Sequence, residues 1–231
     1  MAQAQLQDLP LSIRPAAAHG GNFLSGSSTG MNNEMRSRIL RRDNNTCVYC
    51  GFKALRFQEV RAANPNLAGR PARPEDWITT CHICDQCLSL ERVGLMGEGL
   101  LIWLPEVSQI DLNHMIRALY VARSSDGPLA ETARRGIDSL RSRRDEAKRR
   151  LGTDDPMILA TVLGDFINEE NARGIGEKME GVRFLSLDRR VQRTANGEVD
   201  RFPDMLAYWK SSGGPFGDLP PNQWIGLAEK L

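Results

Sequence analysis

All five cysteines of this 231-residue chain lie in two short stretches, and their spacing constrains the fold more than any other feature. The first stretch, TCVYCG, holds the pair Cys47 and Cys50, and the second, TCHICDQC, holds Cys81, Cys84 and Cys87. A CxxC pair turns two thiolates toward one ion, so two such pairs suit one tetrahedral zinc site. Four sulfur ligands leave no position for water. We therefore predict one structural zinc ion.

The second stretch offers two alternative ligand pairs. Cys81 with Cys84, and Cys84 with Cys87, both satisfy CxxC spacing. We favour Cys81 because residues 77–80 are expected to form a strand that delivers it as a ligand at the strand end. His82 lies between ligand positions and is predicted to be a surface histidine. The predicted ligands are Cys47, Cys50, Cys81 and Cys84, with Cys87 as the alternative fourth ligand.

Changes of composition along the chain predict four segments of one α+β protein. Residues 1–31 are rich in Ala, Gln, Gly and Ser and form an expected flexible arm, of which 9–13 can dock as an edge strand. Residues 32–104 form the zinc module, residues 105–187 a helical part of the same domain, and residues 188–231 a C-terminal tail with short helices. The fold class is a ββα zinc module embedded in a mainly helical domain.

Hydrophobic periodicity indicates the main elements. We expect strands at 55–61, 77–80, 100–104 and 182–187. Residues 129–151 alternate basic and acidic side chains and predict a long, largely solvated helix. Another helix is expected to begin at Pro156, capped by Asp155, with a wide apolar face that places it centrally in the core. Phe216, Trp224, Ile225 and Leu227 in the Pro/Gly-rich tail must dock, either on this chain or on a partner.

Charge and hydropathy limit the classes of partner. The net charge is +1 and the isoelectric point is near 7.7, so the whole molecule has no electrostatic attraction to nucleic acid. The sequence has no apolar run near the roughly 20 residues that span a bilayer and no signal-peptide pattern at its start. We expect a cytoplasmic protein without membrane insertion, in which clustered cysteines are metal thiolates.

The order of a helix, RRDNNTCVYCG, a strand pair, WITTCHIC and a second helix resembles the treble-clef, or ββα-metal, module of HNH endonucleases. Such nucleases need a histidine base in the hairpin and further His or Asn residues that hold a catalytic divalent ion. This chain has Gln58 and Glu59 at the Asp-His position, Asp85 where a histidine would follow the last zinc cysteine, and Asp76 at the Asn position. We therefore predict an HNH-like scaffold without catalytic residues.

A longer stretch resembles the IcmJ/DotN family of Dot/Icm-type (type IVB) secretion and related conjugation systems. The matching residues are Arg42 and Asp43 through TCVYCGFKA, then ITTCHICDQCLSLERVGLMGEGLLIWLPEVSQIDLN. The resemblance implies a non-enzymatic adaptor that lies at the cytoplasmic side of the inner membrane through its partners. It also implies that the chain binds the C-terminal extension of the coupling ATPase, joins the other coupling-complex subunits and helps to present substrate proteins. No partner-contact residues carry over.

Two alternative functions remain at this stage. One is a metal-dependent HNH-type endonuclease that uses the acidic set Glu59, Asp76 and Asp85. The other is a nucleic-acid-binding zinc protein that uses a basic helix. We prefer to interpret that helix as a solvated face, because acids are interleaved and no aromatic residue is available for stacking on bases. Its basic residues are Arg134, Arg135, Arg141, Arg143, Arg144, Lys148, Arg149 and Arg150.

Overall fold

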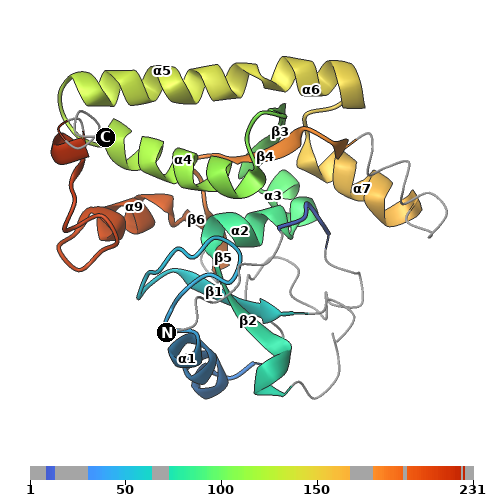
Figure 1. Cartoon of the computed structure of the whole chain (residues 1–231). Helices are drawn as coiled ribbons and strands as arrows, with labels where there is room; N and C mark the ends of the chain where they lie inside the picture. The colour runs from blue at the N-terminus through green and yellow to red at the C-terminus, as the bar shows by residue number, and fades with distance from the viewer. Residues whose placement is uncertain are drawn as a thin grey trace.

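The computed structural model describes residues 9–13, 31–63, 73–166, 179–194, 197–224 and 226. Three two-stranded antiparallel sheets are set among helices, which confirms the predicted α+β class. In Figure 1 the first helix and the first hairpin lie at the bottom, and three helices in the middle of the chain form the top. Cys47 and Cys50 lie between the first helix and the first hairpin, and the other three cysteines lie from the end of that hairpin to the end of the helix that follows it.

The lower part consists of α1 (Asn33–Arg42), β1 (Gln58–Ala62) and β2 (Trp77–Cys81). Asn32 caps α1, because its Oδ1 accepts a hydrogen bond from the backbone N–H of Met35 at 2.7 Å. The hairpin register places Gln58 opposite Cys81, so the strand prediction for 77–80 is confirmed and β1 begins later than predicted. A small apolar core of Ile39, Val60 and Trp77 joins α1 to the hairpin.

The next segments form the centre of the molecule. They are α2 (His82–Cys87), α3 (Leu90–Leu95) and β3 (Gly99–Trp103), and β3 pairs with β4 (Val182–Ser186). A side chain at Gly99 would meet the ring of Phe184 at about 2.1 Å, so only glycine allows this close strand pairing. The side-chain amide of Gln109 extends the pairing, since it bonds both the N–H and the carbonyl of Phe184.

Three helices cover this centre: α4 (Gln109–Arg123), α5 (Pro128–Ser142) and α6 (Arg144–Leu151). The predicted single helix over 129–151 is therefore two helices with Arg143 between them, and they follow one another along the top of Figure 1. Their inner face buries small and aliphatic side chains against α4 and β3, while their charged face stays in solvent.

Helix α7 (Pro156–Phe166) begins where predicted, since the Asp155 carboxylate accepts a hydrogen bond from the N–H of Met157 at 2.8 Å. Its predicted central place in the core is wrong. Ile158 is 51% exposed and Val162 is 42% exposed, because α7 packs on α3 through one face only. Its buried residues are Pro156, Leu159, Ala160 and Leu163.

The C-terminal part adds the hairpin of β5 (Val191–Thr194) and β6 (Gly197–Asp200), then α9 (Phe202–Lys210). The hairpin was not predicted, because β6 has no buried face and hence no apolar alternation. Part of the tail docks on its own chain: Phe216 lies between Phe52 and Trp224, with ring centroids 6.5 and 5.9 Å away. Ile225 and Leu227 lie outside the described residues.

Residues 9–13 dock on the centre without forming a strand. Ser12 donates a hydrogen bond to the carbonyl of Cys87 at 3.0 Å and accepts one from Leu90 at 3.2 Å. Within the described ranges, no helix is long and apolar enough to cross a membrane.

Candidate metal centre

The first cysteine pair lies in a tight turn between α1 and β1. Gly51 has φ +70°, a left-handed conformation that favours glycine, and its N–H donates to the carbonyl of Cys47 at 2.9 Å. The N–H of Cys47 in turn donates to the carbonyl of Phe52 at 3.0 Å. The turn therefore presents Cys47 and Cys50 on one side, as a metal-binding knuckle requires.

The second pair lies where β2 ends and α2 begins. Cys81 is the N-cap of α2, and its Sγ accepts a hydrogen bond from the N–H of Cys84 at 3.5 Å. This geometry places Cys84 in the first helical turn, on the same side as Cys81. The end of β2 thus supplies the sulfur of Cys81, and the first turn of α2 supplies the sulfur of Cys84.

These two pairs meet. The Sγ atoms of Cys47, Cys50, Cys81 and Cys84 all lie within 4.8 Å of one another, and all four residues are buried. Cys50 and Cys81 are 3.6 Å apart at their sulfurs. A tetrahedral ion with Zn–S bonds of about 2.3 Å needs sulfurs about 3.8 Å apart, so the donor set and its size fit zinc. In the described part of the chain this is the one group of His, Cys, Asp or Glu able to hold a metal ion.

Cys87 is not a member of this group. It lies at the end of α2, where its thiol donates to the carbonyl of Ile83 at 3.4 Å. Burial raises the pKa of Cys87 above its usual range, which favours a neutral thiol. The side-chain amide of Asn113 lies between Cys84 and Cys87, 3.4 Å from Cys84 Sγ and 3.7 Å from Cys87 Sγ.

Arg117 lies one helical turn after Asn113 on α4 and also contacts the sulfur group. Its guanidinium donates to Cys81 Sγ at 3.2 Å and stacks 3.8 Å from the ring centroid of Phe52. Burial alone would lower the pKa of Arg117, but the negative charge of the cysteines more than offsets this and raises the pKa above its usual value. A buried, charged arginine compensates part of the negative charge of a four-thiolate site.

The unequal environments of the sulfurs favour ionisation at two of them. Hydrogen bonds from the thiols of Cys47 and Cys84, together with the Arg117 charge, lower the pKa of Cys50. Burial opposes the ionisation of Cys81, but the neighbouring thiols of Cys47 and Cys84 and the Arg117 guanidinium lower its pKa to about 7. Thiolates that form near neutral pH are the species that bind zinc.

Comparison with known proteins identifies the family. No family model matches the chain. A relative from Legionella pneumophila subsp. pneumophila strain Philadelphia 1, "Type 4 apparatus protein DotN", is 33% identical over 176 residues, which cover 72% of this chain and 80% of the relative. The chain belongs to the DotN family. The resemblance to IcmJ/DotN proteins predicted from the cysteine stretches is confirmed.

Sequence reasoning missed the residues of α4 that surround the sulfurs in this DotN-family member. His114 Nε2 lies 2.9 Å from the carbonyl oxygen of Cys50, and Arg117 lies 3.3 Å from His114 Nδ1. The signal was a polar stripe at a spacing of four: Gln109, Asn113 and Arg117 are all buried. Polar residues repeated on one helical face indicate a face that packs on polar groups.

The prediction that His82 lies on the surface is wrong, because this residue is only 3% exposed. All six residues of α2 are buried, since the helix is surrounded by the first hairpin, α3, α4 and β4. Burial, together with the nearby charges of Arg190 and Arg92, lowers the pKa of His82 well below its usual value. A neutral imidazole is therefore expected at this position.

The positions at which the HNH resemblance predicts nuclease residues make structural contacts in this DotN-family chain. Gln58 donates to the carbonyls of Asn45 at 2.7 Å and Phe52 at 2.9 Å. Glu59 forms an ion pair with Arg190 at 3.0 Å. Asp85 pairs with Arg61 at 3.1 Å, and Asp76 accepts a hydrogen bond from the N–H of Arg73 at 2.9 Å. The structure does not bring Glu59, Asp76 and Asp85 together as a metal-binding group.

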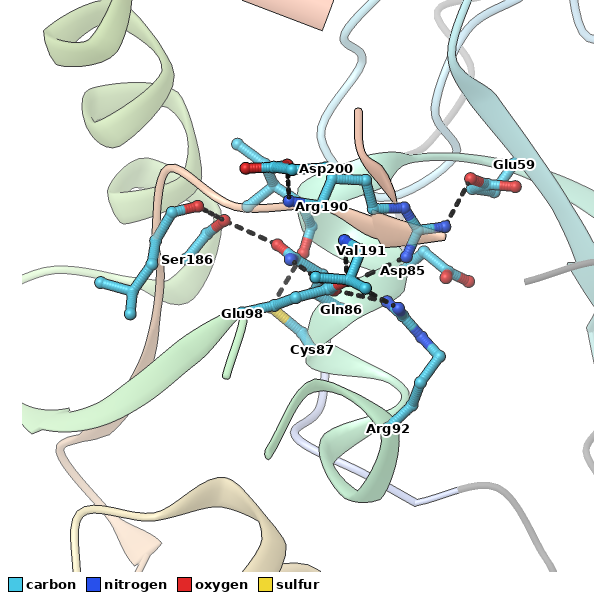
Figure 2. A network of polar contacts seen from close by, with 12 residues as sticks. Glu59, Asp85, Gln86, Cys87, Arg92, Glu98, Ser186, Arg190, Val191 and Asp200 are labelled. Carbon is cyan, nitrogen blue, oxygen red and sulfur yellow. Dashed lines mark hydrogen bonds and ion pairs between the residues drawn. The ribbon is translucent and has the colours of Figure 1, made fainter. Parts of the chain in front are cut away.

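Figure 2 shows the buried polar network to which Glu59 and Asp85 belong. Its centre is Glu98, a fully buried carboxylate between α3 and β3. Glu98 accepts hydrogen bonds from Gln86 at 3.1 Å, Arg92 at 3.1 Å and the N–H of Val191 at 2.8 Å, and Arg190 lies 3.6 Å away. The network joins α2, α3 and the first hairpin to β5.

The basic residues on α5 and α6 are largely compensated. Arg141 pairs with Asp188, Arg143 with Glu106, and Arg144 and Lys148 with Asp154. Arg134 pairs with Glu131, while Arg149 and Arg150 pair with Glu146. Such pairing leaves little free positive charge for a phosphate backbone.

Proposed function

We propose that this chain is a non-enzymatic, zinc-containing adaptor subunit of a type IVB secretion or conjugation apparatus. It binds the C-terminal extension of the coupling ATPase, joins other coupling-complex subunits and aids the recruitment of substrate proteins. This places it in the cytoplasm, at the inner membrane through its partner. The proposal is carried by the 33% identity to "Type 4 apparatus protein DotN" over 80% of that protein.

Zinc is the metal that we propose for the four-thiol centre, with Cys47, Cys50, Cys81 and Cys84 as ligands and Cys87 as a spare thiol. Bound zinc would supply folding free energy, about 10–16 kcal/mol for small structural sites. Arg117 and Asn113 would hold the thiolates in place by hydrogen bonds to sulfur. The four buried sulfurs leave no open ligand position for a reacting water.

An HNH-like scaffold without nuclease activity is part of the same proposal. The order of the cysteine turn, the β1–β2 hairpin and α2 supports the scaffold, because it places two ligands in a knuckle and two at a helix start. The contacts of Gln58, Glu59 and Asp85 support the loss of activity, since none of these side chains is left to act on a phosphate. We also propose the division into an arm (1–31), a zinc module (32–104), a helical part (105–187) and a tail (188–231).

Affinity capture from the native host tests the adaptor function. A tagged full-length chain is purified under mild conditions, and its companions are identified by mass spectrometry. Recovery of a membrane-anchored secretion or conjugation ATPase in amounts comparable to the tagged chain is the expected result. Recovery of nucleic acid, with metal-dependent cleavage of plasmid DNA that a Glu59→Ala variant loses, would replace the adaptor with a nuclease.

A further inference from the structure

The loop between Cys50 and β1 carries the large apolar side chain with the highest exposure in the described part of the chain. Leu55 is 68% exposed, although its neighbour Ala54 is buried. A single exposed leucine is ordinary on a protein surface. Leu55 differs from such a residue in the backbone conformation of its loop and in its two charged neighbours.

The loop holds an unfavourable backbone conformation. Phe57, the last residue of this loop, has φ +62°; the two other non-glycine residues of positive φ in the described chain, Asn44 and Asn45, lie before the first cysteine pair. Asparagine tolerates this left-handed region, but a bulky phenylalanine does not favour it. Strained backbone of this kind concentrates at functional segments.

Contacts with α9 and with the cysteine turn hold the loop in this one shape. The N–H of Leu55 donates to the hydroxyl of Tyr208 at 2.9 Å, and the N–H of Ala54 donates to the carbonyl of Asn45 at 3.1 Å. The Arg56 guanidinium lies 5.1 Å from the ring centroid of Phe57 and 5.4 Å from that of Tyr208. A preorganised loop loses little entropy on binding, so Leu55 is suited to act as an anchor.

Positive charge stands on both sides of this leucine. Lys53 and Arg56 are exposed, and neither forms an ion pair with a residue that the structure describes. The basic residues of α5 and α6 differ, because almost all of them are paired with carboxylates on the same chain. An apolar side chain between two uncompensated cations is complementary to an apolar pocket bordered by carboxylates.

We propose that the loop of residues 53–57 is a docking site for an acidic segment of a partner protein. Leu55 enters an apolar pocket of that segment, and Lys53 and Arg56 pair with carboxylates beside the pocket. The inference rests on the proposed adaptor function and adds to it the surface and the chemistry of the partner.

The test uses the full-length, zinc-loaded chain and the purified C-terminal extension of the host's coupling ATPase as the probe. Affinity is measured by titration calorimetry at two salt concentrations. The variants are Leu55→Asp and the double change Lys53→Glu with Arg56→Glu. Their matched controls are Leu95→Asp, which alters another half-exposed leucine on α3, and Arg134→Glu with Arg135→Glu on α5. Unchanged zinc content and melting temperature show that each variant is folded.

The proposal predicts that both loop variants weaken binding about tenfold or more, that both controls stay within about twofold, and that added salt weakens the wild-type complex. Equal affinities for loop variants and controls would overturn the docking site and leave the adaptor function standing. A wild-type chain that does not bind the extension would instead contradict the adaptor function, and the inference with it. Loss of binding to anionic phospholipid vesicles, with unchanged affinity for the extension, would make the loop a membrane contact and also overturn the proposal.

Discussion

The guanidinium of Arg117 lies 3.2 Å from the Sγ of Cys81, and this contact joins the helical part of the chain to its cysteine centre. Arg117 is buried, and it also stacks on Phe52, which follows the first cysteine pair. Arg117 therefore contacts Cys81 of the second cysteine pair and Phe52, which lies two residues after the first pair. Metal, helix α4 and the cysteine turn are expected to be stabilised together.

Replacing Arg117 by methionine should speed zinc release, because the thiolates lose both a hydrogen bond and a compensating charge. Changes of this kind weaken a metal site about 10–100-fold. The rate is measured by transfer of zinc to a chromogenic chelator. Arg123→Met is the matched control, since Arg123 lies on the same helix and stacks on Tyr120 but has no sulfur contact. Equal release rates for the two variants would refute a role for Arg117 at the metal.

Two serine substitutions in α2 separate the ligand from the spare thiol. Cys84→Ser should yield insoluble or zinc-free protein, because a buried hydroxyl cannot replace the thiolate ligand. Cys87→Ser should keep one zinc ion per chain, since Cys87 lies outside the sulfur group. The measurement is metal content per chain by mass spectrometry of the dissolved sample. A soluble Cys84→Ser protein with a full equivalent of zinc would refute the ligand assignment.

Neutralising Glu98 should lower the free energy of unfolding more than neutralising any other single acidic residue. Glu98→Gln removes the charge that balances Arg92 and Arg190 inside the protein, and losing one partner of a buried pair costs about 3–5 kcal/mol. Urea unfolding of the zinc-loaded chain measures the loss. The control is Glu106→Gln, whose pair with Arg143 is half-exposed and screened by solvent, so its loss should change stability little. A loss below that of the control would show that the network does not stabilise the fold.

Asp43 gives a pH-dependent contribution to stability. Burial alone would raise its pKa, but hydrogen bonds from Arg42 and from the N–H of Thr79, the latter at 3.1 Å, lower it below the usual value. A carboxyl group with a lowered pKa in the folded state stabilises the protein above its unfolded pKa of about 3.9, and this stabilisation is lost as pH falls through the folded pKa.

The Asp43→Asn variant should therefore be less stable than wild type by about 1 kcal/mol at pH 7, and the difference should shrink below about pH 4. Guanidinium unfolding of both proteins at several pH values measures the difference in stability at pH 7 and its change at lower pH. Asp138→Asn, on the exposed face of α5, should show no such trend. A difference for Asp43→Asn that stays constant with pH would contradict the role of its charge.

Local chemistry explains which features could be predicted from the sequence. The left-handed glycine after Cys50 and the Asp155–Pro156 start of α7 are decided within a few residues. The same holds for the two cysteine pairs, because a knuckle and a strand-to-helix junction are short-range structures. Family membership depended on one long stretch around these cysteines.

Other features depend on residues far away in the sequence and could not be predicted. Whether His82 is inside depends on β4, which pairs with β3 from the other end of the chain. The exposed face of α7 likewise depends on how α7 packs against α3. The polar stripe of α4 is visible in the sequence, but the contact of Arg117 with the sulfur of Cys81 depends on how α4 packs. Burial of a polar side chain is a tertiary property.

X-ray absorption at the zinc edge tests most directly whether the metal centre is closed and structural. The full-length chain, purified without added metal, should contain one zinc ion with four sulfur neighbours at about 2.3 Å and no oxygen or nitrogen ligand. Such a shell agrees with a metal that supports the fold of an adaptor. A shell that contains oxygen or nitrogen would contradict it, because an open position on zinc is what hydrolytic chemistry requires.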